Sequence, residues 1–94
     1  MPNDPKRAEI EVVISNTQGM HARPAMKFVD LASHFGCNIR IMKKNLVVDA
    51  KSPMEMMLLE AVKGTVLKII AEGDDSEQAI LQLAELVASK FGEE

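Results

Sequence analysis

The sequence is poor in the residues that stabilise small secreted proteins. It contains one cysteine, Cys37, in 94 residues, so no disulfide can form within the chain. It has three phenylalanines and no tryptophan or tyrosine, which leaves aliphatic residues and methionine to build a core. No apolar run approaches the ~20 residues of a membrane-spanning helix or follows the layout of a signal peptide. We therefore expect one cytoplasmic domain without a membrane partner, in which Cys37 is a small residue at a turn or strand entrance.

Positive charge and metal ligands are also scarce. Lysine and arginine total 11 against 14 acidic residues, which gives a net charge of −3. Domains that bind nucleic acid usually present a basic face, so neither DNA nor RNA is an expected partner. The two histidines, His21 and His34, would lie about three helical turns apart, and no cluster of Cys, His and carboxylates has the spacing of metal ligands. We expect no metal and no cofactor, so a small-ligand or metal-binding domain is the least supported functional class.

The distribution of apolar residues predicts alternating strands and helices. Residues 1–7 contain two prolines and mixed charges, which predicts a disordered lead before a single domain over residues 8–94. Apolar residues alternate in some of the following segments and recur at helical spacing in others. The strands are expected at 8–14, 38–43, 46–49 and 65–72, and the helices at 22–35, from 53 to about 61 and from 76 onward.

The resulting order, β-α-β-β-α-β-α, predicts a two-layer α/β (α+β) domain with an antiparallel sheet. The apolar side of each amphipathic helix must pack against the apolar face of the same sheet, which places the helices in one layer. At the second helix, Ser52, Pro53 and Glu55 have the types and spacing of a capping box. The spacing of the elements does not by itself determine the order of the strands.

The segment Gln18–Ala25, QGMHARPA, places a histidine at the mouth of the first helix and an arginine two residues later. The first turn of a helix offers unpaired backbone N–H groups, here beginning with Ala22, and the positive end of the dipole to an anion. Arg23 would add a planar fork of donors suited to phosphate oxygens. Imidazole is also a good nucleophile near neutral pH, so we interpret His21 as a phosphoryl acceptor. A bare His-x-Arg also fits a helix-capping or surface histidine beside an ordinary arginine.

Within this segment, Gly19–Ala25 resembles the Gly-Leu/Ile-His-Ala/Thr-Arg-Pro-Ala signature of HPr, the histidine-containing phosphocarrier family of the bacterial phosphotransferase system. Two further segments, Lys51–Met54 and Lys63–Gly73, also resemble segments of HPr, with the same offset in residue numbering. The similarity extends from Ala8 to about Ala88 without a gap. It implies the HPr fold, an open-faced β-sandwich with strand order 1-4-2-3 and three helices on one face.

The resemblance also implies a function and the residues that carry it. His21 would be phosphorylated on Nδ1, with Arg23 as its electrostatic partner and Gln18 as a polar contact to the phosphate. The donor would be phosphorylated Enzyme I, charged by phosphoenolpyruvate, and the acceptors would be sugar-specific IIA domains. Such a carrier has no turnover of its own and is not an enzyme. We expect it to be a monomer.

Methionines are concentrated in and around the two helices next to this segment. Methionine stripes usually fill a core, but the short second helix has too many of them for all to face inward. We therefore expect an exposed patch beside His21 that adapts to several partner proteins. Its expected members are Met20, Met26, Pro53, Met54 and Met57.

Ser52 matches the serine that HPr kinase/phosphorylase modifies in many Gram-positive relatives, which reduces carrier traffic or recruits a transcription regulator. Helix capping alone also explains Ser52. Pro53 and Glu55 differ from the Leu or Ile and the small or basic residue usual in the family, and both bear on docking to Enzyme I. The alternative function is therefore a regulatory paralogue, nitrogen-linked or linked to HPr kinase, that acts by protein–protein interaction without sugar transport.

Overall fold

Four antiparallel strands form one sheet in the computed structural model, which describes residues 6–93. Along the sheet the strand order is β1-β4-β2-β3, so the last strand in the chain lies between the first two. This confirms the order that the HPr resemblance implies. The strands are β1 (Arg7–Val13), β2 (Asn38–Lys43), β3 (Leu46–Asp49) and β4 (Val66–Glu72).

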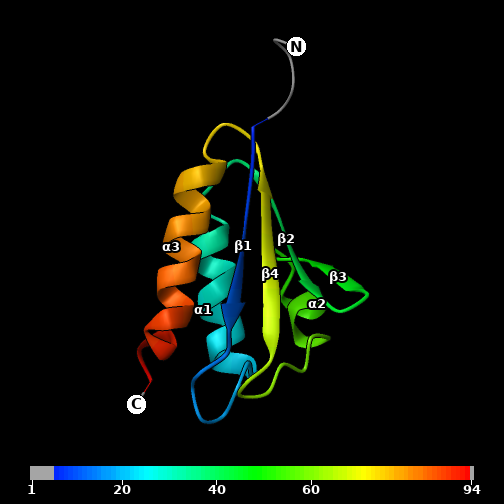
Figure 1. The fold of residues 1–94 in the computed structure, drawn as a ribbon, viewed down its shortest axis with the longest axis vertical. Helices are drawn as coiled ribbons and strands as arrows, with labels where there is room; N and C mark the ends of the chain where they lie inside the picture. The colour runs from blue at the N-terminus through cyan, green and yellow to red at the C-terminus, as the bar shows by residue number, and fades with distance from the viewer. Residues whose placement is uncertain (1–5, 94) are drawn as a thin grey trace.

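The α-helices of the described residues form a second layer on one face of this sheet. Figure 1 shows α1 and α3 side by side against the sheet, with the short α2 near β3. The predicted two-layer α/β architecture is therefore confirmed. The helices are α1 (Ala22–Ala32), α2 (Pro53–Met57) and α3 (Ser76–Ala88), and a 3-10 turn, η1 (Lys90–Gly92), follows α3.

The alternation of apolar residues along the strands accounts for the core. In β4, Leu67, Ile69 and Ala71 point toward the helices and are buried. Neighbouring strands present partly or fully buried aliphatic residues on the same face. The helices meet them with residues at helical spacing, which are Ala25, Phe28, Val29 and Ala32 of α1 and Ala79, Ile80, Leu83 and Val87 of α3.

The first strand and the first helix each differ from the prediction at one end. The strand β1 begins at Arg7, so the disordered lead predicted over residues 1–7 is wrong at Arg7. Residues 1–5 of that predicted lead lie outside the described part of the chain. The helix α1 ends at Ala32 rather than near Phe35. The N–H of Phe35 bonds to the carbonyl of Ala32 three residues back, at 3.2 Å, so the chain tightens into turns there.

The second helix is shorter than predicted, and its cap forms only in part. It ends at Met57 rather than near Ala61. The Oγ of Ser52 accepts the N–H of Glu55 at 3.2 Å, as a capping box requires. The carboxylate of Glu55, however, accepts the N–H of Asp49 at 2.9 Å instead of returning to the N-cap residue. The reciprocal half of the predicted box is therefore wrong.

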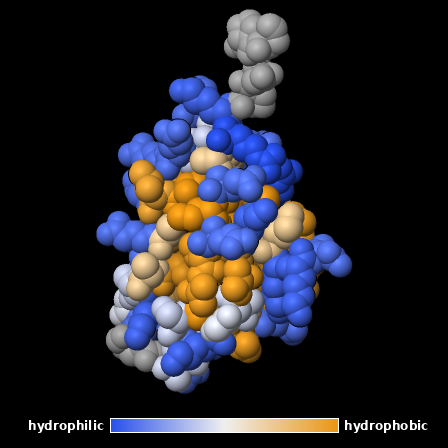
Figure 2. Space-filling view, viewed as in Figure 1, coloured by the Kyte–Doolittle hydropathy of each residue, from blue (hydrophilic) through white to orange (hydrophobic). Residues whose placement is uncertain are grey.

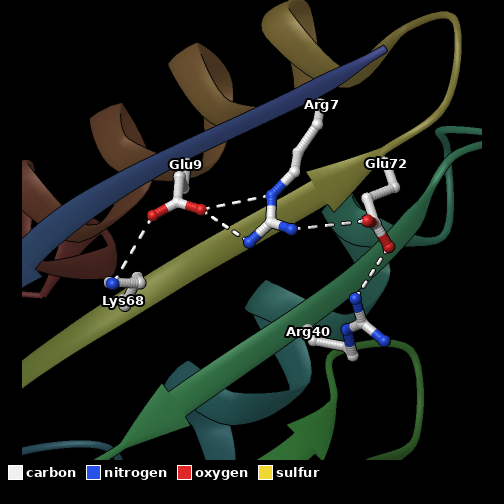
Figure 3. Close-up of polar contacts among 5 residues, drawn as sticks. All are labelled: Arg7, Glu9, Arg40, Lys68 and Glu72. Carbon is white, nitrogen blue, oxygen red and sulfur yellow. Dashed lines mark hydrogen bonds and ion pairs between the residues drawn. The ribbon is translucent and has the colours of Figure 1, made fainter. Parts of the chain in front are cut away.

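Charged side chains cover part of the other face of the sheet. Figure 3 shows Arg7 between Glu9 and Glu72, with Lys68 beside Glu9 and Arg40 beside Glu72. The hydrogen bond from Arg7 holds the pKa of Glu9 below its ordinary value. Because these ion pairs are partly exposed, each adds little to the free energy of unfolding. Figure 2, in the same view as Figure 1, shows an apolar region bordered by hydrophilic side chains.

Candidate functional site

The loop between β1 and α1 is fixed by buried backbone contacts. Gly19 has a left-handed backbone, with φ +72°, and an added Cβ would lie 2.6 Å from the carbonyl oxygen of Ala61. The next residue, Met20, donates its N–H to that carbonyl at 2.7 Å. The buried side chain of Asn16 donates to the carbonyl of Gly19 at 2.7 Å. These contacts therefore fix the position at which the loop presents the following residue, His21.

His21 occupies the N-cap position of α1. Its backbone is extended, with φ −86° and ψ −169°, and its carbonyl accepts the N–H of Ala25 at 3.0 Å. The side chain makes no capping hydrogen bond and remains 39% exposed. The side chain of His21 therefore does not cap the helix, so the helix-capping part of the alternative interpretation is wrong. Because Pro24 has no N–H, the first-turn donors are those of Ala22 and Arg23.

His21 lies at an open pocket of about 430 Å³. The predicted residues Gln18 and Arg23 line the same pocket, so the structure brings all three side chains together. An arginine, a lysine and the first turn of a helix favour an anion here, and the carboxylate of Glu93 at the same wall opposes one. Its remaining lining residues are Lys27, Gly92 and Glu93.

Sequence reasoning missed the contribution of the C-terminal segment to this pocket. The Oε1 atom of Glu93 lies 3.3 Å from Nε2 of His21. Lys27 is an exposed residue of α1, and its Nζ donates to the carbonyl of Phe91 at 2.7 Å. Contacts between residues this far apart leave no local pattern. The only signal was an apolar residue, Phe91, close to the chain end, which in the structure is buried.

The exposure predicted for the methionines is confirmed at Met54 and Met57 of α2 and is wrong at Met20. The side chain of Met20 is 4% exposed and belongs to the core, because the loop backbone turns it inward. Met54 and Met57 are 83% and 42% exposed, and Met26 of the adjoining α1 is also exposed. Leu58, at the C-cap of α2, and Val62 are exposed apolar residues as well.

The other two predicted features, Ser52 and Cys37, lie outside the pocket. Ser52 is half-buried at the N-cap of α2. Cys37 is buried immediately before β2, as expected for a residue at a strand entrance. Burial, together with the neighbouring Asp75 carboxylate, raises the pKa of its thiol to about 11. A neutral, buried thiol is a poor nucleophile.

The chain thus combines an open-faced α/β fold with a histidine and an arginine at the start of a helix, where backbone N–H groups favour an anion such as phosphate. A family model described as PTS HPr component phosphorylation site matches residues 8–89. The chain belongs to the HPr phosphocarrier family. No helix among residues 6–93 combines the length and apolar character needed to cross a membrane.

Individual relatives agree with this assignment. Phosphocarrier protein HPr of Pseudomonas aeruginosa is 40% identical over 89% of this chain and 94% of that protein. The crystal structure of HPr from Thermoanaerobacter tengcongensis has 49% identity and a TM-score of 0.89, covering 93% of this chain and 98% of that chain. The crystal structure of Crh, the Bacillus subtilis catabolite repression protein, has 36% identity and a TM-score of 0.72, covering 79% of this chain and 85% of that chain.

Proposed function

We propose that this protein carries phosphoryl groups within the phosphotransferase system. His21 accepts the group from phosphorylated Enzyme I, which takes it from phosphoenolpyruvate, and passes it to sugar-specific IIA proteins. The observation that carries the proposal is the exposed ring of His21 beside Arg23 at the start of α1, in an open pocket. The protein presents the group to its partners and has no turnover of its own. It acts in the cytoplasm and as a monomer.

The pocket has the parts that phosphoryl transfer requires. The reaction depends on positioning and charge neutralisation more than on acid–base chemistry. The N–H of Ala22, the guanidinium of Arg23 and the amide of Gln18 would supply donors for the three phosphate oxygens. Because the pocket is open to solvent, a partner can bring its own active site to Nδ1 of His21.

The test of the site is replacement of His21. Purified protein is incubated with phosphoenolpyruvate, Enzyme I and a IIA protein, and acid-labile phosphate is followed on each component. His21→Ala should abolish the label while leaving the circular dichroism spectrum unchanged. His34→Ala, at the other histidine, is the matched control and should be labelled like the wild type. A label that persists in His21→Ala would move the site elsewhere.

The same assay separates the carrier from the regulatory alternative. A carrier passes its label to the IIA protein and is labelled again, so phosphate accumulates on the acceptor. A regulatory paralogue would retain the label when Enzyme I and IIA are both present. The family assignment and the open pocket support the carrier.

The apolar surface of α2 and α1 is the proposed docking site for Enzyme I and IIA proteins. It consists of Met26, Pro53, Met54 and Met57, and Leu58 and Val62 extend it. Met54→Asp should raise the KM for Enzyme I about tenfold, since it buries a charge in a desolvated contact. Leu81→Asp is the matched control, because Leu81 is an exposed residue of α3 outside this surface. Equal KM values for the two variants would contradict the assignment.

Ser52 is a second proposed modification site, for HPr kinase/phosphorylase. A phosphate there would add negative charge beside the carboxylate-bearing Glu55 and next to the exposed Pro53 and Met54. It would thereby weaken docking or offer a new contact to a transcription regulator. The test is ATP-dependent mass gain with the kinase on the wild type and its loss in Ser52→Ala. A wild type that stays unmodified would reject this part of the proposal.

A further inference from the structure

The segment after α3 lines one wall of the pocket and is held there by several contacts. Phe91 is 1% exposed and packs into the core. The Nζ of Lys27 donates to the carbonyl of Phe91 at 2.7 Å. Gly92 follows with a left-handed backbone, φ +73°, and Glu93 then reaches His21 with 3.3 Å between Oε1 and Nε2. The side chain of Glu93 is only 16% exposed, so it lies against the pocket wall and not in solvent.

We propose that Glu93 is a positioning residue that keeps the proton of His21 on Nε2 and the lone pair on Nδ1. A carboxylate can only accept a hydrogen bond, so Nε2 must be the donor in this pair. Neutral imidazole carries one N–H, and the other nitrogen is then the nucleophile. The inference rests on the proposed phosphorylation of His21 and adds the residue that selects the reactive nitrogen.

The contact also balances the charge of the transfer step. As the bond from Nδ1 to phosphorus forms, the bond from phosphorus to the donor side chain breaks, and its electron pair leaves with the donor atom. The proton stays on Nε2, so the phosphorylated ring bears a positive charge. The Glu93 carboxylate compensates that charge without taking the proton, as a buried aspartate does for a catalytic imidazole. Arg23 lines the same pocket and is available to the phosphate oxygens.

His34 provides an internal reference for the tautomer. Its Nδ1 lies 2.7 Å from the carbonyl oxygen of Asp30. A carbonyl oxygen accepts, so Nδ1 of His34 is the donor and its lone pair is on Nε2. We therefore expect His21 in the Nε2–H form and His34 in the Nδ1–H form, and one spectrum can record both.

The experiment measures ring nitrogen shifts and transfer rates on the full chain. Histidine is labelled with 15N in the wild type, Glu93→Gln, Glu93→Ala and the charge-matched control Glu77→Gln on exposed α3 surface. Spectra are recorded at a pH where the rings are neutral. His21 should be the Nε2–H form in the wild type and Glu93→Gln, and should move toward a two-tautomer average in Glu93→Ala. His34 should keep the Nδ1–H form in all four proteins.

The transfer rates test the charge compensation. The kcat for phosphoryl transfer from Enzyme I should fall about tenfold in Glu93→Gln, because a neutral acceptor is weaker than a charged one. It should fall further in Glu93→Ala, with the KM for Enzyme I unchanged in both variants and wild-type kinetics in Glu77→Gln. Identical spectra and rates in the wild type and Glu93→Ala would overturn the role of Glu93. Absence of label from wild-type His21 would instead reject the proposed function, and the tautomer result would still decide the role of Glu93.

Discussion

Lys27 of α1 donates from Nζ to the carbonyl oxygen of Phe91 at 2.7 Å, which ties the segment after α3 to the helix whose N-cap is His21. Lys27→Met keeps the aliphatic stem and removes the charged donor. We expect the free energy of unfolding to fall by ~1 kcal/mol, since the bond is only partly buried. Urea unfolding measures the change. Lys63→Met, at an exposed lysine before β4, is the control, and an equal loss there would contradict a specific tie.

Asp75 joins the start of α3 to the turn before β2, and this contact should make stability depend on acid pH. Its carboxylate accepts the N–H groups of Gly36 at 2.8 Å and Cys37 at 3.0 Å. The hydrogen bond from the Cys37 thiol, followed by that from Gly36, holds the pKa of Asp75 below its ordinary value. The stabilisation is therefore complete above that ordinary pKa and is lost as the pH falls through the lowered one.

Asp75→Asn tests this dependence. The variant should be less stable than the wild type at pH 7, and the difference should shrink as the pH falls below the ordinary range of an aspartate pKa. Unfolding free energies from urea titrations across this range give the curve. Asp74→Asn removes the neighbouring exposed carboxylate and should show no such convergence. A difference between Asp75→Asn and the wild type that is independent of pH would contradict the prediction.

The Cys37 thiol should titrate in the alkaline range. Burial, supported by Asp75, raises its pKa from 9.0 to about 11. The folded state therefore retains the proton longer than the unfolded chain, so this contribution to stability is present below pH 9.0 and is lost as the pH rises toward 11. Thiolate absorbance during a pH titration gives the midpoint. Asp75→Asn should lower the midpoint only in part, because burial is the larger cause, and a wild-type midpoint near 9.0 would reject the assignment.

Local patterns were sufficient to predict the architecture and the place of His21 at the start of a helix. Alternation along the strands indicated which face of each strand is buried, and the His21 to Arg23 segment was expected at a helix entrance, where the structure has it. The strand order came only from family resemblance, because β4 pairs with strands distant in sequence. Periodicity cannot indicate which distant strands become neighbours.

The errors arose where one residue depends on another element. Met20 was expected in an exposed methionine patch, yet the left-handed turn at Gly19 directs it into the core. Glu55 was expected to complete a capping box, but the N–H of Asp49 competes for its carboxylate. The role of Glu93 depends on a contact with a residue near the other end of the chain. Such contacts become visible only when the fold is known.

The turn at Gly19 positions His21, and alanine substitutions at three glycines test this role. Gly19 combines φ +72° with a blocked Cβ position, 2.6 Å from the carbonyl oxygen of Ala61. Gly64 has φ +92° but open space around the added Cβ, and Gly36 has neither constraint. Alanine at the three positions therefore separates backbone strain from steric overlap.

Gly36→Ala should change the free energy of unfolding by less than about 0.5 kcal/mol, and Gly64→Ala should cost ~1 kcal/mol from the left-handed backbone alone. Gly19→Ala should cost ~3 kcal/mol, since backbone atoms must shift to admit the methyl group. Because that shift displaces the residue two positions later, Gly19→Ala should also reduce phosphoryl transfer through His21 at temperatures where it remains folded. Urea unfolding and the transfer assay measure the two effects. Wild-type transfer in a folded Gly19→Ala would mean that this turn does not position the histidine.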